Sequence, residues 1–297
     1  MSHALEFKTY QEDFGRGLAE WHSIGEEDKQ KMFFLGANGQ AASTYPFFLR
    51  KIAKHYQIKA LENRAAWPNR PAPTMEDIWR EFVIDYEHFL SFHKADKGGV
   101  THLGHSFGAS LGVLLAYRRP ELFDRLVLVE PGMTTSRWQA MIFRMMSYKQ
   151  RGENTFMKKT RLRQNEFASK QSFMDIMRTK KNYQGFCEEA MQDYADGGLV
   201  QAGDQYKLKF SGVWESHNFC DAHYLLAKIV RLKVPTLVLF SDNSYVLKLK
   251  RSEAFKKHCE QRSSNVEVKI LKDIGHFCIQ ENPDYVASEV LNWLGKQ

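Results

Sequence analysis

The sequence predicts an α/β protein with three layers, in which a mostly parallel sheet has helices on both faces and carries an inserted helical region. Short apolar runs alternate with stretches of helical periodicity along most of the 297 residues. These runs are apolar throughout, which is typical of parallel strands that are covered on both faces. Eight of the eleven methionines fall between residues 133 and 191, and this abrupt change in composition marks the insert.

The expected elements follow one another in a simple order. The first two strands have no helical stretch between them, so we expect the sheet to start with an antiparallel pair. The expected strands are 4–10, 17–22, 32–35, 58–61, 100–103, 126–129, 236–240 and 266–271. The expected helices outside the insert are 45–56, 75–93, 107–118, 250–261 and 283–294.

The insert is expected to be a helical cap that spans residues 133–230, with residues 1–132 and 231–297 forming the core. Its apolar residues, such as Phe173, Met174 and Met177, recur at helical spacing. Residues 137–181 contain twelve Lys and Arg against three acids, although the net charge of the whole chain is only +7. This basic stretch is either a solvated helix face or a positive rim that attracts an anionic small-molecule substrate. The methionines are either ordinary core or an adaptable apolar pocket wall.

Composition excludes several classes of protein. Hydrophobic residues make up 43% of the chain and charged residues 26%, so disorder and collagen-like repetition are excluded. No apolar run approaches the roughly 20 residues of a membrane span, and the first residues do not resemble a secretory signal. The four cysteines have no zinc-type spacing, and no nucleic-acid-binding module surrounds the basic stretch. We expect a soluble, cytoplasmic protein without a metal or an organic cofactor; its oligomeric state is left open.

The run Gly104-His105-Ser106-Phe107-Gly108 carries the strongest chemical signal. It lies between an expected strand and an expected helix, where a Gly-x-Ser-x-Gly turn lifts the serine hydroxyl clear of the sheet. The glycines allow neighbouring backbone to pass without a Cβ clash. We therefore predict that Ser106 is a nucleophile and that the Phe107 backbone N–H is an oxyanion donor.

A serine nucleophile needs a base and a second oxyanion donor. His276 follows the last expected strand and precedes the closing helix, so it can fold back over the carboxyl ends of the strands, and we predict that it is the base. His105, beside the nucleophile, is predicted to be structural. The glycine-rich turn after the strand 32–35 ends at Gln40, whose backbone N–H is the predicted second oxyanion donor.

With these motifs in order, the chain resembles the α/β-hydrolase superfamily from about Phe33 onwards. It is most similar to the capped branch with a serine nucleophile, whose architecture is like that of haloalkane dehalogenases and epoxide hydrolases. The resemblance implies a Ser–acid–His triad in chain order and hydrolysis of an ester or a related bond. It rests on the segments 36–40, 58–64, 104–108, 118–123, 234–240 and 275–277.

The sequence departs from the family pattern at two places. The usual oxyanion histidine-glycine appears as Asn38-Gly39, and the position after the strand 236–240 that usually holds the acid is Ser244. Two carboxylates could replace that acid. Glu130 ends the strand 126–129, where some capped branches place their acid, and it is the preferred assignment; Asp242 is the alternative.

The predicted function is therefore that of a serine hydrolase that forms an acyl-enzyme on a small or medium ester, thioester or lactone. One alternative uses the same triad for carbon–carbon bond hydrolysis or perhydrolysis. The other is a ligand-binding protein that keeps the fold with little turnover, which the irregular acid site favours.

Overall fold

The strands of the protein fall into one large sheet and one small sheet. A computed structural model describes residues 5–94, 98–134, 136–221 and 223–295. The strands of the large sheet are β1 (Lys8–Asp13), β2 (Leu18–Ile24), β3 (Lys31–Leu35), β4 (Gln57–Leu61), β5 (Val100–His105), β6 (Phe123–Val129), β10 (Thr236–Ser241) and β11 (Val266–Leu271). Those of the small sheet are β7 (Glu166–Phe167), β8 (Leu199–Ala202) and β9 (Gln205–Leu208).

Helices follow most strands of the large sheet, and further helices fill the chain between β6 and β10. The first group is α1 (Pro46–Ile52), α2 (Trp79–His93), α3 (Phe107–Arg118), α11 (Leu249–Arg262), α12 (Cys278–Glu281) and α13 (Pro283–Trp293). The second group is α4 (Arg137–Met145), α5 (Tyr148–Gly152), α6 (Thr155–Arg161), α7 (Lys170–Thr179), α8 (Glu188–Gly198), α9 (Gly212–Phe219) and α10 (Leu226–Ile229).

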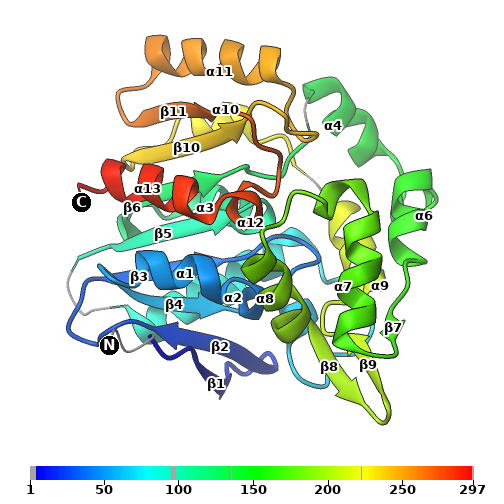
Figure 1. Cartoon of the computed structure of the whole chain (residues 1–297). Coiled ribbons are helices and arrows are strands. Elements are labelled where there is room, and N and C mark those ends of the chain that lie inside the picture. Colours follow the sequence, from blue (N-terminus) through cyan, green and yellow to red (C-terminus); the bar gives the residue numbers. More distant parts are fainter. Residues whose placement is uncertain (1–4, 95–97, 135, 222, 296–297) are drawn as a thin grey trace.

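The large sheet has the strand order β1-β2-β4-β3-β5-β6-β10-β11 (Figure 1). Strands β1 and β2 pair antiparallel, as do β2 and β4, whereas every pair from β4 to β11 is parallel. The predicted α/β class, with its mostly parallel sheet, is therefore confirmed. Parallel pairing directs the carboxyl ends of these strands to one edge, where open α/β sheets bind ligands.

Both faces of the large sheet are covered by apolar side chains, as the apolar strands predict. On β3, Phe33 and Leu35 belong to one buried cluster, which also contains residues of α2, α3 and α11. Met32 and Phe34 belong to a second cluster, which contains residues of α1 and α13. Because successive side chains of a strand point to opposite faces, a strand between two helical layers must be apolar at every position.

The start of the sheet differs from the prediction. The first strand was expected over 4–10 but begins at Lys8 and ends at Asp13, and the expected residue 4 lies outside the described residues. β1 is an edge strand whose side chains are mostly exposed, so its apolar pattern is weak. Its pairing with β2 sets the register instead, which runs from Lys8 opposite Ser23 to Asp13 opposite Leu18.

The chain between β6 and β10 is not purely helical, which corrects the expectation for the insert. It holds the antiparallel sheet β7-β9-β8 as well as helices (Figure 1). Strands β8 and β9 are joined by a two-residue turn in which Gly203 adopts a φ of +62°. The dipeptide Gly203-Asp204 between two short strands is a hairpin signal that the helical spacing around it obscured.

Candidate active site

The predicted site residues gather at the carboxyl edge of the large sheet. Ser106 follows β5, Glu130 follows β6, and His276 lies in the loop between β11 and α12. The loop after β3 contains Gln40. These segments are far apart in the sequence, and the parallel arrangement of the strands brings them together.

Ser106 occupies a strained turn between β5 and α3. Its φ of 51° and ψ of −109° lie in a region that non-glycine residues rarely adopt. Tight backbone contacts leave no space for a side chain two residues before Ser106 or two residues after it. A Cβ at Gly104 would lie 2.5 Å from the Ala109 nitrogen, and one at Gly108 would lie 2.2 Å from the Leu35 carbonyl oxygen. Both glycines of the motif are therefore required by close packing.

A chain of hydrogen bonds joins Ser106, His276 and Glu130. His276 Nε2 lies 3.0 Å from Ser106 Oγ, and His276 Nδ1 lies 2.8 Å from Glu130 Oε2. Because a carboxylate only accepts, Nδ1 donates to Glu130 and Nε2 is left to accept from the serine hydroxyl. The three residues are 8%, 4% and 1% exposed respectively, so both hydrogen bonds are shielded from water.

Glu130 is held by groups from β10 and the loop that follows it. Its carboxylate accepts hydrogen bonds from the Ser241 backbone N–H at 2.6 Å and from the Ser244 hydroxyl. Ser244 is the residue at the position where the resemblance leads one to expect the acid. The structure thus places Glu130 beside Ser244. The carboxylate at position 130 accepts a hydrogen bond from the hydroxyl at position 244, where the resemblance leads one to expect an acid.

Asp242, the alternative acid, binds the backbone of the loop that carries His276. Its two carboxylate oxygens accept from the backbone N–H groups of Asp273 and Ile274, at 3.1 and 3.3 Å. The described structure contains no hydrogen bond between Asp242 and His276. This carboxylate therefore orders the turn that leads to the histidine without touching its ring.

His105 supports the backbone of His276. Its Nε2 lies 3.0 Å from the His276 carbonyl oxygen, and its Nδ1 lies 2.9 Å from the Tyr45 hydroxyl. Complete burial lowers the pKa of His105 to about 3, and the neighbouring His276 adds to this effect. The ring is consequently neutral, so Nε2–H donates to the carbonyl and Nδ1, which then carries no proton, faces the Tyr45 hydroxyl. This contact was not foreseen in the sequence, where His105 was expected only to be structural.

The backbone N–H groups of Phe107 and Gln40, the two predicted oxyanion donors, differ in whether another group already accepts their hydrogen bond. Phe107 is the first residue of α3, so its backbone N–H has no acceptor within the helix. A Cβ at Gly132 would lie 3.6 Å from this nitrogen and 3.2 Å from Ser106 Oγ, so both atoms face the same space. The Gln40 backbone N–H, in contrast, donates to the Ala37 carbonyl at 3.2 Å. The prediction for Gln40 is corrected in this respect, because a tight turn already uses the donor.

Asn38 lies in the same loop and was not assigned a role from the sequence. It lines the cavity beside Ser106, and within the described residues its backbone N–H makes no hydrogen bond. Its side chain donates to the Glu215 carbonyl at 2.9 Å and accepts from Asn218 at 2.9 Å. Asn38 is thus anchored by α9, which only the folded chain brings close.

Ser106 and His276 open into a cavity of about 730 Å³. This volume is within the range of pockets for small molecules, about 300–1,000 Å³. Its walls come from both the large sheet and the chain between β6 and β10. The apolar side chains of the second region are Met133, Phe156, Phe173, Met177, Tyr183, Tyr194, Leu208 and Phe219.

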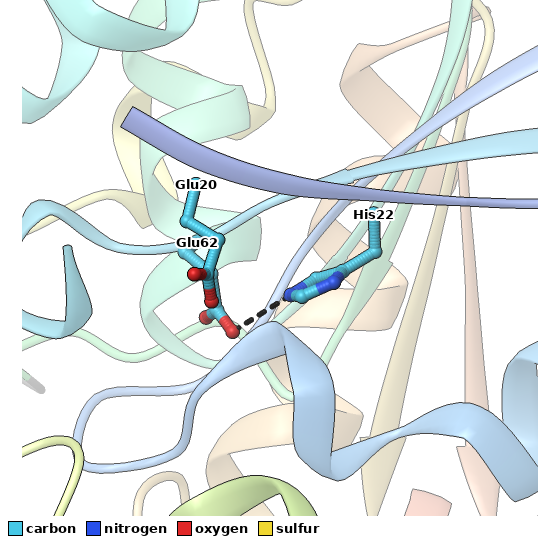
Figure 2. Close-up of side chains that lie close together, drawn as sticks. All are labelled: Glu20, His22 and Glu62. Atoms are coloured by element: carbon cyan, nitrogen blue, oxygen red, sulfur yellow. Dashed lines mark hydrogen bonds and ion pairs between the residues drawn. The ribbon is translucent and has the colours of Figure 1, made fainter. Parts of the chain in front are cut away.

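One cluster of side chains has the donor atoms of a metal site. Glu20, His22 and Glu62 direct their side chains toward one another, with His22 Nε2 bonded to Glu62 Oε1 at 2.9 Å (Figure 2). The Lys209 ammonium already occupies this place, since it pairs with Glu20 and lies 2.9 Å from Glu62 Oε1. Burial by itself would raise the pKa of Glu62, but Lys209 and His22 lower it well below its usual value. A lysine therefore supplies the positive charge that these carboxylates require.

Comparisons with known proteins agree with this fold. The chain belongs to the α/β hydrolase fold family, whose family model matches residues 93–283. A comparison with curated proteins finds no match. Within the described residues, no helix is both long enough and apolar enough to cross a membrane.

Solved structures share the whole fold at low sequence identity. E-2-(acetamidomethylene)succinate hydrolase has 13% identity and a TM-score of 0.78, covering 98% of this chain and 100% of its own. The thioesterase domain from the curacin biosynthetic pathway has 15% identity and a TM-score of 0.73, with coverage of 97% and 100%. The peroxisomal α/β-hydrolase Lpx1 of Saccharomyces cerevisiae has 13% identity and a TM-score of 0.75, with coverage of 98% and 88%. Similarity at this level of identity establishes the fold and no particular substrate.

Proposed function

We propose that the protein is a serine hydrolase that cleaves a small or medium ester, thioester or lactone through an acyl-enzyme. The observation that carries this proposal is the unbroken chain from Ser106 Oγ through His276 to the Glu130 carboxylate, with contacts of 3.0 and 2.8 Å. Nucleophile, base and orienting acid within hydrogen-bond reach are the features that acyl transfer requires.

In the proposed reaction, His276 Nε2 takes the proton of Ser106 while Ser106 Oγ attacks the substrate carbonyl carbon. The carbonyl electron pair moves to the oxygen, which the backbone N–H groups of Phe107 and Asn38 stabilise. The tetrahedral intermediate then expels the alcohol or thiol, which takes the proton from His276. Water attacks the acyl-enzyme in the same way, with His276 as base, and releases the acid. Glu130 holds the ring in the required tautomer and stabilises the imidazolium.

The chain from 133 to 230 is part of the proposal as a cap over the core formed by 1–132 and 231–297. Its apolar side chains line the cavity into which Ser106 opens, and we assign them to the body of the substrate. Carbon–carbon bond hydrolysis and perhydrolysis would use the same residues, so they stand as the alternative reactions. A ligand-binding protein with little turnover is the alternative outside catalysis.

A series of p-nitrophenyl esters and a fluorophosphonate probe test the proposal. Wild-type protein should hydrolyse the esters and become labelled at Ser106, and Ser106→Ala and His276→Ala should abolish labelling. Glu130→Gln should lower kcat by about 10³–10⁴-fold, because an amide favours the wrong tautomer. Asp242→Asn is the matched control at the alternative acid and should retain activity within about tenfold. Ester binding without turnover or labelling would instead support the ligand-binding alternative.

A further inference from the structure

The part of the cavity wall that comes from the chain between β6 and β10 carries an excess of positive charge. Three cationic side chains and one carboxylate line the cavity. The cations are Lys159, Arg163 and Lys180, and the carboxylate is Glu215. A substrate bound at Ser106 therefore shares its cavity with at least two uncompensated positive charges.

Arg163 is held rigidly but is not saturated. Its Nη1 lies 2.7 Å from Glu215 Oε2, although this ion pair is not an aligned hydrogen bond, and its Nη2 donates to the Phe210 carbonyl at 2.8 Å. Its Nε is buried without a hydrogen-bond partner among the described residues. This nitrogen packs against the start of α9, where a Cβ added at Gly212 would lie 3.3 Å from it.

Lys180, which follows α7, provides the second charge. The described part of the chain offers its ammonium no hydrogen bond or ion pair. Burial lowers the pKa of Lys180, and the nearby Arg163 lowers it further, whereas Glu215 opposes both effects. An additional anion in the cavity would relieve the repulsion between the two cations.

We infer that Arg163 and Lys180 form a subsite for a carboxylate on the substrate, in the same cavity as Ser106. This inference rests on the proposed hydrolase function and names its substrate class: esters or thioesters whose acyl part ends in a carboxylate. Guanidinium and ammonium donors match the two oxygens of a planar carboxylate. The apolar side chains that line the same cavity contact the carbon chain that joins the two groups.

The test compares p-nitrophenyl hemiadipate with p-nitrophenyl 6-methylheptanoate, in which an isopropyl group replaces the carboxylate. Wild-type protein should show a higher kcat/KM for the hemiadipate after subtraction of the uncatalysed rate. Lys180→Met should lower the ratio of the two kcat/KM values by about 10- to 100-fold, the effect of losing a hydrogen bond to a charged group. Lys180→Glu should lower this ratio further, because it places a carboxylate against that of the substrate.

Lys181→Met provides the matched control, since Lys181 is the exposed neighbour and does not line the cavity. Its ratio should equal that of the wild type, which separates the subsite from the general basic charge of the segment. Arg163→Lys keeps a positive charge beside Glu215 and should also lower the ratio. Equal kcat/KM for the two esters, or a ratio that Lys180→Met leaves unchanged, would overturn the subsite while leaving the hydrolase function intact. Absence of turnover on both esters together with absence of Ser106 labelling would instead overturn the hydrolase function.

Discussion

Helices α3 and α4 are both rich in apolar residues, but they have opposite surroundings. In α3, nine of twelve residues are buried between the large sheet and neighbouring helices. In α4, Trp138, Met141, Ile142 and Met145 share one face and are 72%, 46%, 57% and 80% exposed, and Ala140 is the buried residue of the helix. Periodicity identifies which side chains share a face, whereas the tertiary structure determines what covers that face.

The chain between β6 and β10 has a small core of its own, contributes Phe210, Trp214, Leu225 and Ile229 to the large core, and makes polar attachments to the rest of the chain. Phe173, Met177 and Tyr194 belong to this separate cluster. Lys209 attaches it through Glu20 and Glu62, and Asp193 accepts a hydrogen bond from the Phe47 backbone N–H at the start of α1. We therefore expect stability to depend on the core, then on these attachments, and least on the exposed face of α4.

The largest difference in the free energy of unfolding is expected between matched substitutions in α3 and α4. Leu115→Ala in α3 removes a fully buried side chain and should lower the free energy of unfolding by about 2–5 kcal/mol. Ile142→Ala in α4 should change it by less than about 0.5 kcal/mol, since its side chain is largely exposed. Urea unfolding at pH 7 measures both values. A loss of similar size in the two variants would show that α4 is covered in solution and would contradict the comparison.

The second largest effect on the free energy of unfolding is expected at the attachment through Lys209. Lys209→Met leaves the buried Glu62 without its cation and should lower the free energy of unfolding by about 3 kcal/mol at pH 7. Lys207→Met, two residues earlier on β9, removes an exposed ion pair with Glu166 and should change it by less than about 1 kcal/mol.

Lowering the pH should reduce the difference in the free energy of unfolding between wild-type protein and Lys209→Met. Folding lowers the pKa of Glu62, so its ionised carboxylate stabilises the folded state at pH values above the unfolded pKa of about 4.3. This stabilisation is lost as the pH falls below that value. Unfolding curves measured from pH 7 to pH 3 should therefore converge. A difference that is constant over this range would mean that the charge of Glu62 is not its source.

The attachment at Asp193 should have the smallest of these effects and the opposite pH dependence. Burial raises the pKa of Asp193 to about 6, although the Phe47 N–H and Arg50 oppose this. A raised carboxyl pKa means that the folded state holds the proton more tightly. Its stabilisation is present below the unfolded value of about 3.9 and is lost as the pH rises through 6.

Asp193→Asn removes this titration and keeps a hydrogen-bond acceptor for Phe47. Relative to the variant, wild-type protein should lose about 2 kcal/mol of stability between pH 4 and pH 7. Thermal or urea unfolding of both proteins across this range provides the measurement. Parallel pH profiles would show that Asp193 is ionised at the lower pH in the folded state.

Local patterns made the turn that holds the candidate nucleophile and most of the sheet predictable. Gly104, Ser106 and Gly108 lie within five residues, so the strand, the strained turn and the helix can be inferred from one short run. The apolar strands likewise predicted a sheet covered on both faces. The periodicity of apolar residues did not correctly predict elements that are short or weakly buried. These are the edge strand β1 and the short hairpin β8–β9.

The sequence by itself determined the fold class, the turn that holds Ser106 and the position of His276 in the chain, because these depend on local spacing and periodicity. Only the tertiary structure decided which carboxylate faces the His276 ring. Glu130, Ser244 and His276 come from three different strand ends, and their distances depend on how parallel strands align in register. It likewise decided that the Gln40 N–H is used within its own turn and that Lys180 faces the cavity of Ser106. The direction of a hydrogen bond and the compensation of a charge are properties of groups distant in sequence, so no local pattern contains them.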